Sequence, residues 1–292
     1  MKLVSFRVGG EGRIGILRGD RVFDLSKADP GLPRCLRGLL EMGAEGLRRA
    51  ALAAEGELEA LALDQVELLP PVPKPEKIIC VGLNYADHAA ESGMRPPREP
   101  VIFNKLPTTL RGSGDPIVLP ELSQEVDYEA ELVVVIGIGG RAVPRDKALA
   151  HVAGYMCGND VSARDWQKGK PGGQWLLGKS FDSFAPTGPA LVTSDEVGDP
   201  GKLRIQCRLN HRLVQDSCTD QLIFPVAELI AYVSRVATLT PGDLIFTGTP
   251  PGVGMARTPP LYLHPGDLVE VEIERVGLLR NRVAGPPLAS VE

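Results

Sequence analysis

The chain has 292 residues, 43% of them hydrophobic and 24% charged, with a formal net charge of −5. This composition supports a sizeable folded core and is unlike that of a disordered chain. The acidic balance, without a long basic run, excludes nucleic acid and anionic membranes as expected partners. No apolar run reaches the roughly 18 residues of a membrane-spanning helix, and we expect no signal peptide because the first residues are too polar.

The cysteines are scattered, odd in number and without a Cys-x-x-Cys pair: Cys35, Cys80, Cys157, Cys207 and Cys218. A disulfide framework or a zinc site is therefore not expected, and a reducing cytoplasm is the expected location. The 33 glycines and 26 prolines predict many turns between short strands.

Residues 1–70 are predicted to form a small α+β domain. Its expected elements are strands at 3–8, 14–17, 21–25 and 66–69, and a Leu/Ala-rich helical stretch over 34–62. Four prolines between residues 70 and 75 make a stiff linker. We place the domain boundary there, so that residues 71–292 form the second domain, which carries the chemical motifs.

The first of these motifs follows an apolar strand predicted over 77–81. His88 and Glu91 lie three residues apart and would share one face of a short helix. A carboxylate beside an imidazole orients it and tunes its basicity, as a water-activating base requires. The alternative is an ordinary surface ion pair. Glycine and prolines over 92–100 predict a mobile loop, which would place the pair on a lid.

Strands at 101–105 and 117–119 lead to an acidic stretch. Asp127, Glu129 and Glu131 alternate just before an apolar strand predicted over 132–138. Residues two apart on a strand point to the same face, so we expect three clustered carboxylates. Clustered like charges cost energy unless a cation neutralises them, and a hard divalent ion with oxygen ligands is the simplest such cation. The alternative is an acidic strand end dissolved in water.

A helix over 145–152 and a strand over 153–159 come next, and the strand runs into Asp160, a further candidate ligand. Arg164 and Gln167 follow three residues apart, so one helical turn would aim both at the same place. A guanidinium there would bind a carboxylate through two hydrogen bonds. The alternative for Arg164 is a salt bridge to Asp160 or Asp165.

Lys179 follows an apolar segment and a glycine, which would bring its ammonium near the metal; the alternative is a solvated lysine. The rest of the chain predicts strands at 190–193, 203–209, 244–247 and 268–273, and an amphipathic helix over 226–237. A glycine-rich turn over 247–254 would expose backbone N–H groups and the Thr249 hydroxyl to an anion. It lacks the ending of a P-loop, so nucleotide binding is not expected.

The order of these runs resembles the fumarylacetoacetate hydrolase superfamily over residues from about 75 to 285. The runs that carry the resemblance are 81–91, 127–132, 159–165, 178–179 and 247–254. The stretches 123–131 and 174–179 look most like the branch of fumarylacetoacetate hydrolase domain-containing protein 2. The small N-terminal unit also fits prokaryotic members of the superfamily that act on sugar-derived 2,4-diketo acids.

The resemblance implies a mixed, mainly β fold, the family's β-roll, with a small α+β N-terminal domain and assembly as a homodimer. It implies Mg²⁺ (or Mn²⁺) held by Glu129, Glu131 and Asp160, whereas Asp127 is not a ligand position. It also implies catalytic roles for His88, Glu91 and Lys179. The residues implied to bind a small-molecule 2-oxo acid substrate are Arg164, Gln167 and Thr249.

One position departs from the pattern of the members that cleave fumarylacetoacetate. They carry a further metal carboxylate seven residues before the catalytic histidine, where this chain has Val81. The chain therefore resembles the shorter acylpyruvate and oxaloacetate branch.

The expected function is a Mg²⁺-dependent reaction of 2-oxo or 2,4-diketo acids through a metal-bound enolate, with C–C bond hydrolysis of an acylpyruvate-type substrate as the main expectation. The alternatives on the same scaffold are oxaloacetate decarboxylation and keto–enol tautomerisation. The alternative from another class is a catalytically inactive metal-dependent binding protein.

Overall fold

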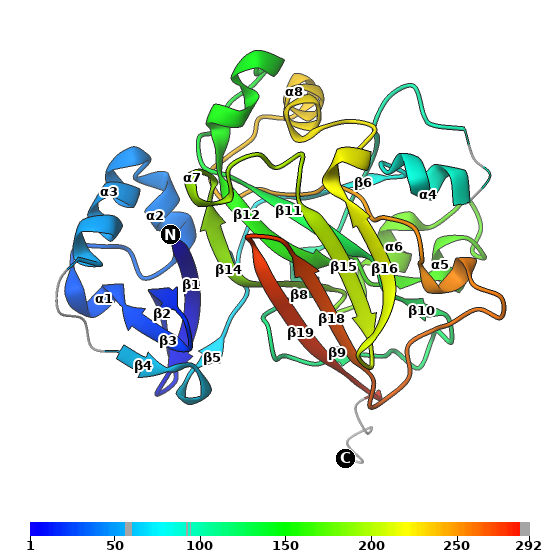
Figure 1. Ribbon diagram of the computed structural model, residues 1–292, viewed down its shortest axis with the longest axis horizontal. Helices are drawn as coiled ribbons and strands as arrows, with labels where there is room; N and C mark the ends of the chain where they lie inside the picture. The colour runs from blue at the N-terminus through cyan, green and yellow to red at the C-terminus, as the bar shows by residue number, and fades with distance from the viewer. Residues whose placement is uncertain (56–59, 92, 94, 287–292) are drawn as a thin grey trace.

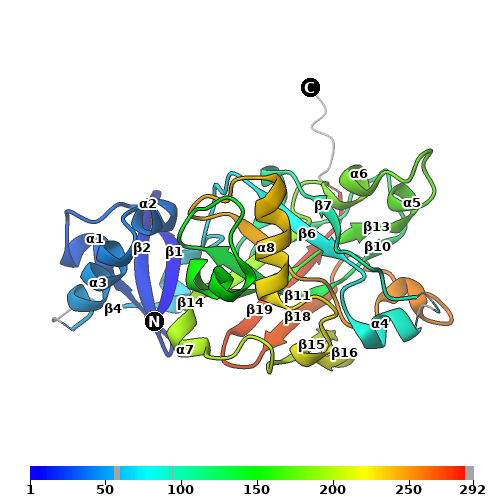
Figure 2. The same ribbon diagram turned by 90° about the horizontal axis from the view of Figure 1, so that it is seen from above.

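The structure, a computed structural model, describes residues 1–55, 60–91, 93 and 95–286. Most of its regular elements are β-strands, arranged in a twelve-stranded sheet, a five-stranded sheet and a two-stranded ribbon (Figure 1). The predicted mixed, mainly β fold is confirmed. Both views show the N-terminal strands and helices at one end of an elongated molecule (Figure 2).

The N-terminal part forms an antiparallel sheet beside three helices. Its elements are β1 (Lys2–Val8), β2 (Glu11–Arg18), β3 (Arg21–Asp24), α1 (Leu25–Ala28), α2 (Leu36–Glu41), α3 (Ala44–Ala53), β4 (Ala60–Ala62), η1 (Leu63–Gln65) and β5 (Glu67–Leu68). The helical prediction over 34–62 is confirmed for α2 and α3, is wrong for β4, and lies outside the described residues at 56–59. Residues 60–62 are drawn into a strand because they pair with β3, which overrides their helical propensity.

The second part begins after the prolines. Its elements as far as the acidic stretch are β6 (Ile78–Gly82), α4 (Ala86–Glu91), β7 (Val101–Asn104), η2 (Pro107–Thr109), β8 (Leu110–Arg111), β9 (Ile117–Val118) and β10 (Val126–Asp127). The predicted loop over 92–100 has no helix or strand at its described positions; residues 92 and 94 lie outside the described residues.

The remaining elements carry most of the core. They are β11 (Ala130–Ile136), η3 (Arg145–His151), β12 (Val152–Asn159), β13 (Ser162–Ala163), α5 (Arg164–Gln167), α6 (Trp175–Lys179), β14 (Ala185–Thr193), α7 (Ser194–Val197), β15 (Arg204–Leu209), β16 (Arg212–Cys218), η4 (Thr219–Gln221), α8 (Val226–Val236), β17 (Leu244–Phe246), η5 (Gly254–Ala256), β18 (Leu268–Ile273) and β19 (Gly277–Ala284).

The large sheet crosses the predicted domain boundary. Its order is β4-β3-β2-β1-β14-β12-β11-β17-β6-β7, and the link between the two parts is the antiparallel pair β1 with β14, where Leu3 lies opposite Leu191. Apolar side chains of the first part, Leu3, Leu36 and Leu39 among them, share a core with β11, β12 and β17. The division at residue 70 therefore stays a prediction, since both sheet and core run across it.

Strand β11 lies at the centre of the molecule, and every residue in it is buried. Leu132, Val134 and Ile136 face the core that the large sheet shares with β15, β18, β19 and α8. Val133 and Val135 face the core beneath the N-terminal helices. Alternate side chains of a strand point to opposite faces. A strand that is covered on both faces therefore has a continuous apolar sequence, as β11 has.

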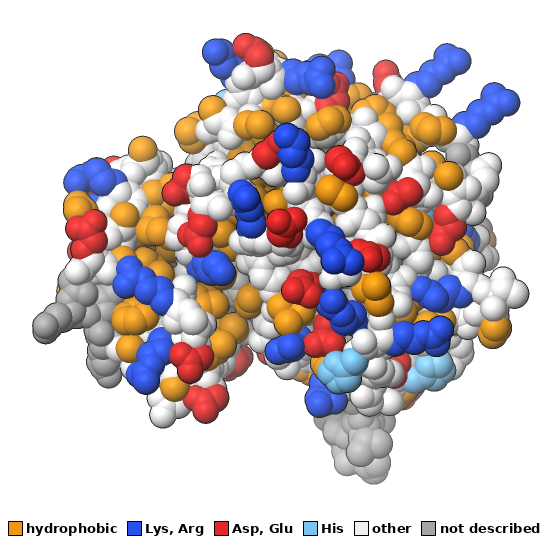
Figure 3. All heavy atoms as spheres, in the orientation of Figure 1, with side chains coloured by type: hydrophobic (Ala, Val, Ile, Leu, Met, Phe, Trp, Pro, Cys, Tyr) orange, Lys and Arg blue, Asp and Glu red, His pale blue; other side chains and the backbone are white. Residues whose placement is uncertain are grey.

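The surface is mixed in charge. On the face shown in Figure 3, acidic and basic side chains are interspersed and no large patch of one sign dominates. Among the described residues, no helix is long and apolar enough to cross a membrane.

Truncating β11 will destabilise the whole fold. Leu132 is fully buried, so we expect Leu132→Ala to lower the free energy of unfolding by about 2–5 kcal/mol, through lost burial and a cavity. Urea unfolding measures this difference. Leu122→Ala is the matched control, since Leu122 is 67% exposed, and its effect should stay within about 0.5 kcal/mol. Equal losses in the two variants would contradict the central place of β11.

Candidate active site

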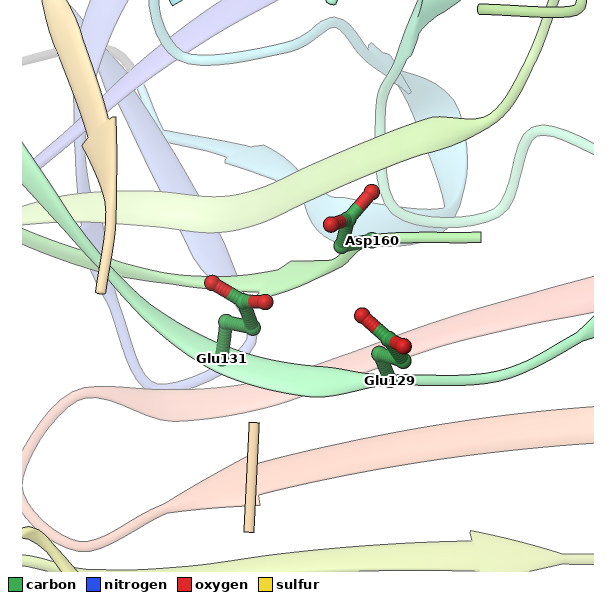
Figure 4. A group of neighbouring side chains, drawn as sticks. All are labelled: Glu129, Glu131 and Asp160. Atoms are coloured by element: carbon green, nitrogen blue, oxygen red, sulfur yellow. The ribbon is translucent and has the colours of Figure 1, made fainter. Parts of the chain in front are cut away.

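Three carboxylates converge where β11 begins and β12 ends. Glu131 lies in β11, Glu129 just before it, and Asp160 just after β12. The two strands are antiparallel, with Ala130 opposite Asn159, so their acidic ends meet. Oxygen atoms of the three side chains lie within 4.8 Å of one another, and all three residues are buried (Figure 4).

Asp127 does not belong to this cluster. It lies in the separate strand β10, so the expectation that Asp127, Glu129 and Glu131 share one strand face is wrong. Its carboxylate accepts hydrogen bonds from the backbone N–H groups of Gly254 and Met255 at 2.7 and 3.1 Å, and pairs with Arg164. Asp127 thus ties a loop and a guanidinium to the edge of the site.

Buried cations compensate most of this negative charge. Lys179 Nζ lies 2.7 Å from Glu129 and 2.8 Å from Asp160, and Arg164 Nη2 lies 2.7 Å from both Asp127 and Glu129. Lys105 Nζ donates to the other oxygen of Asp160. Glu131 has no ion pair within the described part of the chain; its carboxylate accepts a 2.7 Å hydrogen bond from the Gly248 N–H.

This uneven pairing shifts the pKa values of Glu129 and Glu131 in opposite directions. Burial raises the pKa of Glu129, but Lys179 and Arg164 outweigh it and lower that pKa to about 2. Burial, with Asp160 and Glu129 beside it, raises the pKa of Glu131 well above its ordinary value. Burial lowers the pKa of Lys105 despite Asp160, whereas Asp160 and Glu129 outweigh burial and raise the pKa of Lys179. Glu131 is therefore the acid that lacks a cation.

A cavity of about 460 Å³ opens onto this centre. Eight of the residues predicted for the site line it: His88, Glu91, Glu129, Glu131, Arg164, Gln167, Lys179 and Thr249. Asp160 lies behind them against Lys105 and Lys179, fully buried. An apolar wall faces the acids, where Trp175 packs edge-on against Phe103 with ring centroids 5.4 Å apart.

The His88–Glu91 pair forms as predicted on the short helix α4. His88 Nδ1 lies 3.2 Å from a Glu91 carboxylate oxygen, and the Gly252 N–H donates to the same carboxylate at 3.1 and 3.2 Å. A carboxylate only accepts, so this contact places the proton on Nδ1 and leaves Nε2 as the basic nitrogen. The Ser217 hydroxyl donates to Asp87, which further tethers α4 to the body of the protein.

The predicted substrate-binding residues lie in the cavity but already have partners. Arg164 Nη1 donates to Gln167 at 2.9 Å, while its other nitrogens pair with Asp127 and Glu129. The alternative that Arg164 pairs with Asp160 or Asp165 is wrong. The Thr249 hydroxyl donates to the Ala130 carbonyl and accepts from Gln215. These side chains shape the wall of the site.

Sequence reasoning missed three supporting residues. Lys105 donates a hydrogen bond to Asp160. Its position directly after an apolar strand could have indicated a buried lysine, as the apolar segment before Lys179 did. Gln215 accepts from the Ala130 N–H and donates to Thr249, and Asn159 accepts from the Glu129 N–H. A buried glutamine far along the chain carries no sequence signal of such a contact.

The donor set fits a hard divalent cation. Carboxylate oxygens are the ligands that Mg²⁺ and Mn²⁺ prefer. The cluster is buried, its oxygens converge, and Glu131 faces the cavity without a cationic partner among the described residues. One added cation would compensate that charge.

A mainly β fold that gathers buried carboxylates and a His–Glu pair around one cavity has the construction of an enzyme. The chain belongs to the fumarylacetoacetate hydrolase family, whose sequence profile, described as "Fumarylacetoacetate (FAA) hydrolase C-terminal", matches residues 77–284. It is 48% identical to the Xenopus laevis protein named "Oxaloacetate tautomerase fahd2, mitochondrial" over 287 residues, 97% of this chain and 90% of the relative. The resemblance to the branch of fumarylacetoacetate hydrolase domain-containing protein 2 is confirmed.

Solved structures agree with this assignment. The fumarylacetoacetate hydrolase from psychrophilic Exiguobacterium antarcticum is 38% identical with a TM-score of 0.86, and the match covers 98% of this chain and 99% of that one. Maleylpyruvate hydrolase from Sphingobium sp. SYK-6, in complex with manganese(II) ion and pyruvate, is 34% identical with a TM-score of 0.81, over 98% and 100% of the two chains.

One prediction is overturned by the relatives. Animal proteins that match this chain over most of its length, the frog protein among them, carry "mitochondrial" in their names. The prediction of a cytoplasmic location is therefore wrong. It rested on scattered cysteines and a polar start, which do not distinguish one reducing compartment from another.

The uncompensated acid gives a testable pH dependence. Native Glu131 keeps its proton to higher pH than the unfolded chain does, so it lowers the free energy of unfolding as pH rises above about 4.5, the ordinary glutamate value. In EDTA, we expect Glu131→Gln to raise the melting temperature relative to the unsubstituted protein at pH 7.5, and the gain to shrink towards pH 5. With Mg²⁺ the order should reverse, since only the carboxylate gains from the ion.

Calorimetry at the two pH values, with and without Mg²⁺, measures these differences. Glu272→Gln serves as the control, because Glu272 pairs with Arg208 on the exposed side of β18 and should show no response to Mg²⁺. A Glu131→Gln protein that Mg²⁺ stabilises as strongly as the unsubstituted protein would exclude Glu131 as a ligand.

Proposed function

We propose that this enzyme interconverts the keto and enol forms of an oxaloacetate-type 2-oxo acid, with Mg²⁺ or Mn²⁺ held by Glu129, Glu131 and Asp160. The observation that carries the proposal is that Glu129 and Glu131 of the acidic centre line the same cavity as the His88–Glu91 pair. The names of the relatives, oxaloacetate tautomerases at 47–50% identity, support tautomerisation over the other outcomes expected from the sequence.

The divalent cation would act as a Lewis acid on the 2-oxo group and so lower the cost of removing a proton from the neighbouring carbon. His88 Nε2 takes that proton, because Nδ1 is held by Glu91. Glu91 stabilises the imidazolium that results and keeps the ring in place. His88 then returns the proton to oxygen, or to carbon in the reverse direction, so that no water is consumed and the atoms balance.

Lys179 has a supporting role in this scheme. Its ammonium bridges Glu129 and Asp160 and lies 5.1 Å from the centroid of the Phe103 ring, at the wall of the cavity. A permanent positive charge there holds the two carboxylates together and favours negative charge developing on a substrate oxygen. Arg164 holds Glu129 from the other side.

C–C bond hydrolysis of an acylpyruvate-type substrate is the second candidate. It is favoured by the His88 side chain, which is 14% exposed and can therefore receive water from solvent as a general base. The hydrolase among the solved relatives supports it as well. The two candidates share the acidic centre and differ in whether His88 acts on the substrate or on a water molecule. The homodimer implied by the family resemblance is part of the same proposal.

A substrate panel tests the function. Purified protein with Mg²⁺ is given oxaloacetate, acylpyruvates and 2,4-diketo acids, and enol content and products are followed by ultraviolet absorbance and NMR. We expect accelerated keto–enol exchange of oxaloacetate without release of pyruvate. Cleavage products from acylpyruvates would establish the second candidate instead. No turnover of any compound by metal-loaded protein would favour a catalytically inactive binding protein.

Substituting His88, the proposed base, tests whether the reaction rate can be lowered without a change in metal affinity. We expect His88→Ala to lower the exchange rate about 10²–10⁴-fold, the usual contribution of a general base, with unchanged affinity for Mg²⁺. The matched control is His211→Ala, because His211 also lies 3.0 Å from a glutamate, Glu270, but does not line the cavity. Full activity in His88→Ala would remove His88 from the mechanism.

A further inference from the structure

Lys168 differs from the other lysines of the site in having no carboxylate partner among the described residues. Lys168 follows helix α5, where its backbone N–H donates to the Arg164 carbonyl at 2.9 Å. Lys168 is exposed to solvent and is one of the residues that line the cavity, with Gln167, Met255 and Ala256. A lysine thus lies on the wall of the same cavity onto which Glu129 and Glu131 open.

The other cations of the site have committed partners. Arg164, Lys179 and Lys105 each pair with one or two of the buried carboxylates. Within the described residues, Lys168 forms no ion pair, and no hydrogen bond from its ammonium is found. It is thus a positive charge that the chain itself leaves free to meet an anion in the cavity.

The charges around Lys168 are of both signs. Burial and the neighbouring Arg164 lower the pKa of Lys168, whereas Glu129 and Asp127 act in the opposite direction. These two acids already accept from Arg164 and, for Glu129, from Lys179. An anion entering the cavity would therefore meet Lys168 without displacing an existing pair.

We infer that Lys168 binds the second carboxylate of a dicarboxylic 2-oxo acid whose 2-oxo end lies at Glu129, Glu131 and Asp160. The inference rests on the proposed function and deepens it. It makes Lys168 a specificity-determining residue, because a monocarboxylic 2-oxo acid offers the acidic centre the same 2-oxo end but gives Lys168 nothing to bind. The enzyme would then prefer substrates of the oxaloacetate class over pyruvate-like monoacids.

Binding of two unreactive probes tests this directly. L-malate and L-lactate share a 2-hydroxy acid end and differ in the second carboxylate. In calorimetric titrations of the Mg²⁺-loaded protein, we expect Lys168→Gln to weaken L-malate binding about tenfold or more and to leave L-lactate binding unchanged. Lys168→Arg should retain most of the affinity for L-malate, since it keeps the charge.

Lys170→Gln is the matched control. Lys170 lies two residues further on, stacks over the Trp166 ring at 4.7 Å and does not line the cavity, so its loss should change neither affinity. Equal weakening of both probes by Lys168→Gln would overturn the inference, as would an unchanged affinity for L-malate.

Kinetics distinguish this inference from the proposed function. In Lys168→Gln, KM for oxaloacetate should rise about tenfold while kcat changes little, because the second carboxylate keeps its charge through the reaction and the lost contact is as strong in the bound substrate as in the transition state. If the unsubstituted enzyme converts oxaloacetate and Lys168→Gln behaves identically, only the role of Lys168 fails. If the unsubstituted enzyme neither converts oxaloacetate nor binds L-malate, the proposed function fails, and the role of Lys168 fails with it.

Discussion

Buried negative charge is the constraint on which this site depends. Asp127, Glu129, Glu131 and Asp160 are all nearly inaccessible to solvent, and an unpaired carboxylate in such a place costs several kcal/mol. The chain meets the cost with buried cations for three of the four. Glu131 keeps only a backbone N–H as its partner. Among the described residues, the four carboxylates are thus paired with only three buried cations, and the remaining negative charge favours the binding of a further cation.

The rest of the scaffold fixes where those charges lie. Strands β11 and β12 bring Glu129, Glu131 and Asp160 together, and the loop after β17 closes over them. That loop needs glycine at 248, where φ is +102° and a Cβ would lie 2.8 Å from the Asn84 Cβ. Asn84 itself donates to the Thr247 carbonyl at 2.8 Å, which joins the loop to the segment between β6 and α4. The acidic centre and the helix that carries His88 are therefore held by one network.

What the sequence predicted well was local. The apolar runs of β6, β11 and β12, the amphipathic helix α8 and the spacing of His88 and Glu91 all follow from periodicity, and each forms as expected. What it could not predict was long-range. The pairing of β1 with β14, the reach of Lys105 to Asp160 and the contact of Gln215 with Ala130 join residues 55 to 190 positions apart. Asp127 was misplaced because alternation was continued across a break between two strands.

The same geometry explains how one family supports several reactions. Tautomerisation and C–C hydrolysis both need a 2-oxo acid bound at the cation that the three carboxylates would hold, and a general base beside it. Glu91 accepts from His88 Nδ1, which leaves Nε2 free to act as that base in either reaction. They differ in what lies against Nε2. A substrate whose reacting carbon lies against Nε2 would exclude water from that position, which favours proton transfer within the substrate. A substrate bound only at its 2-oxo end would leave room for a water molecule at Nε2. If Lys168 holds the second carboxylate as proposed, it would help to fix where the reacting carbon lies relative to His88, and so bear on the type of reaction as well as on the choice of substrate.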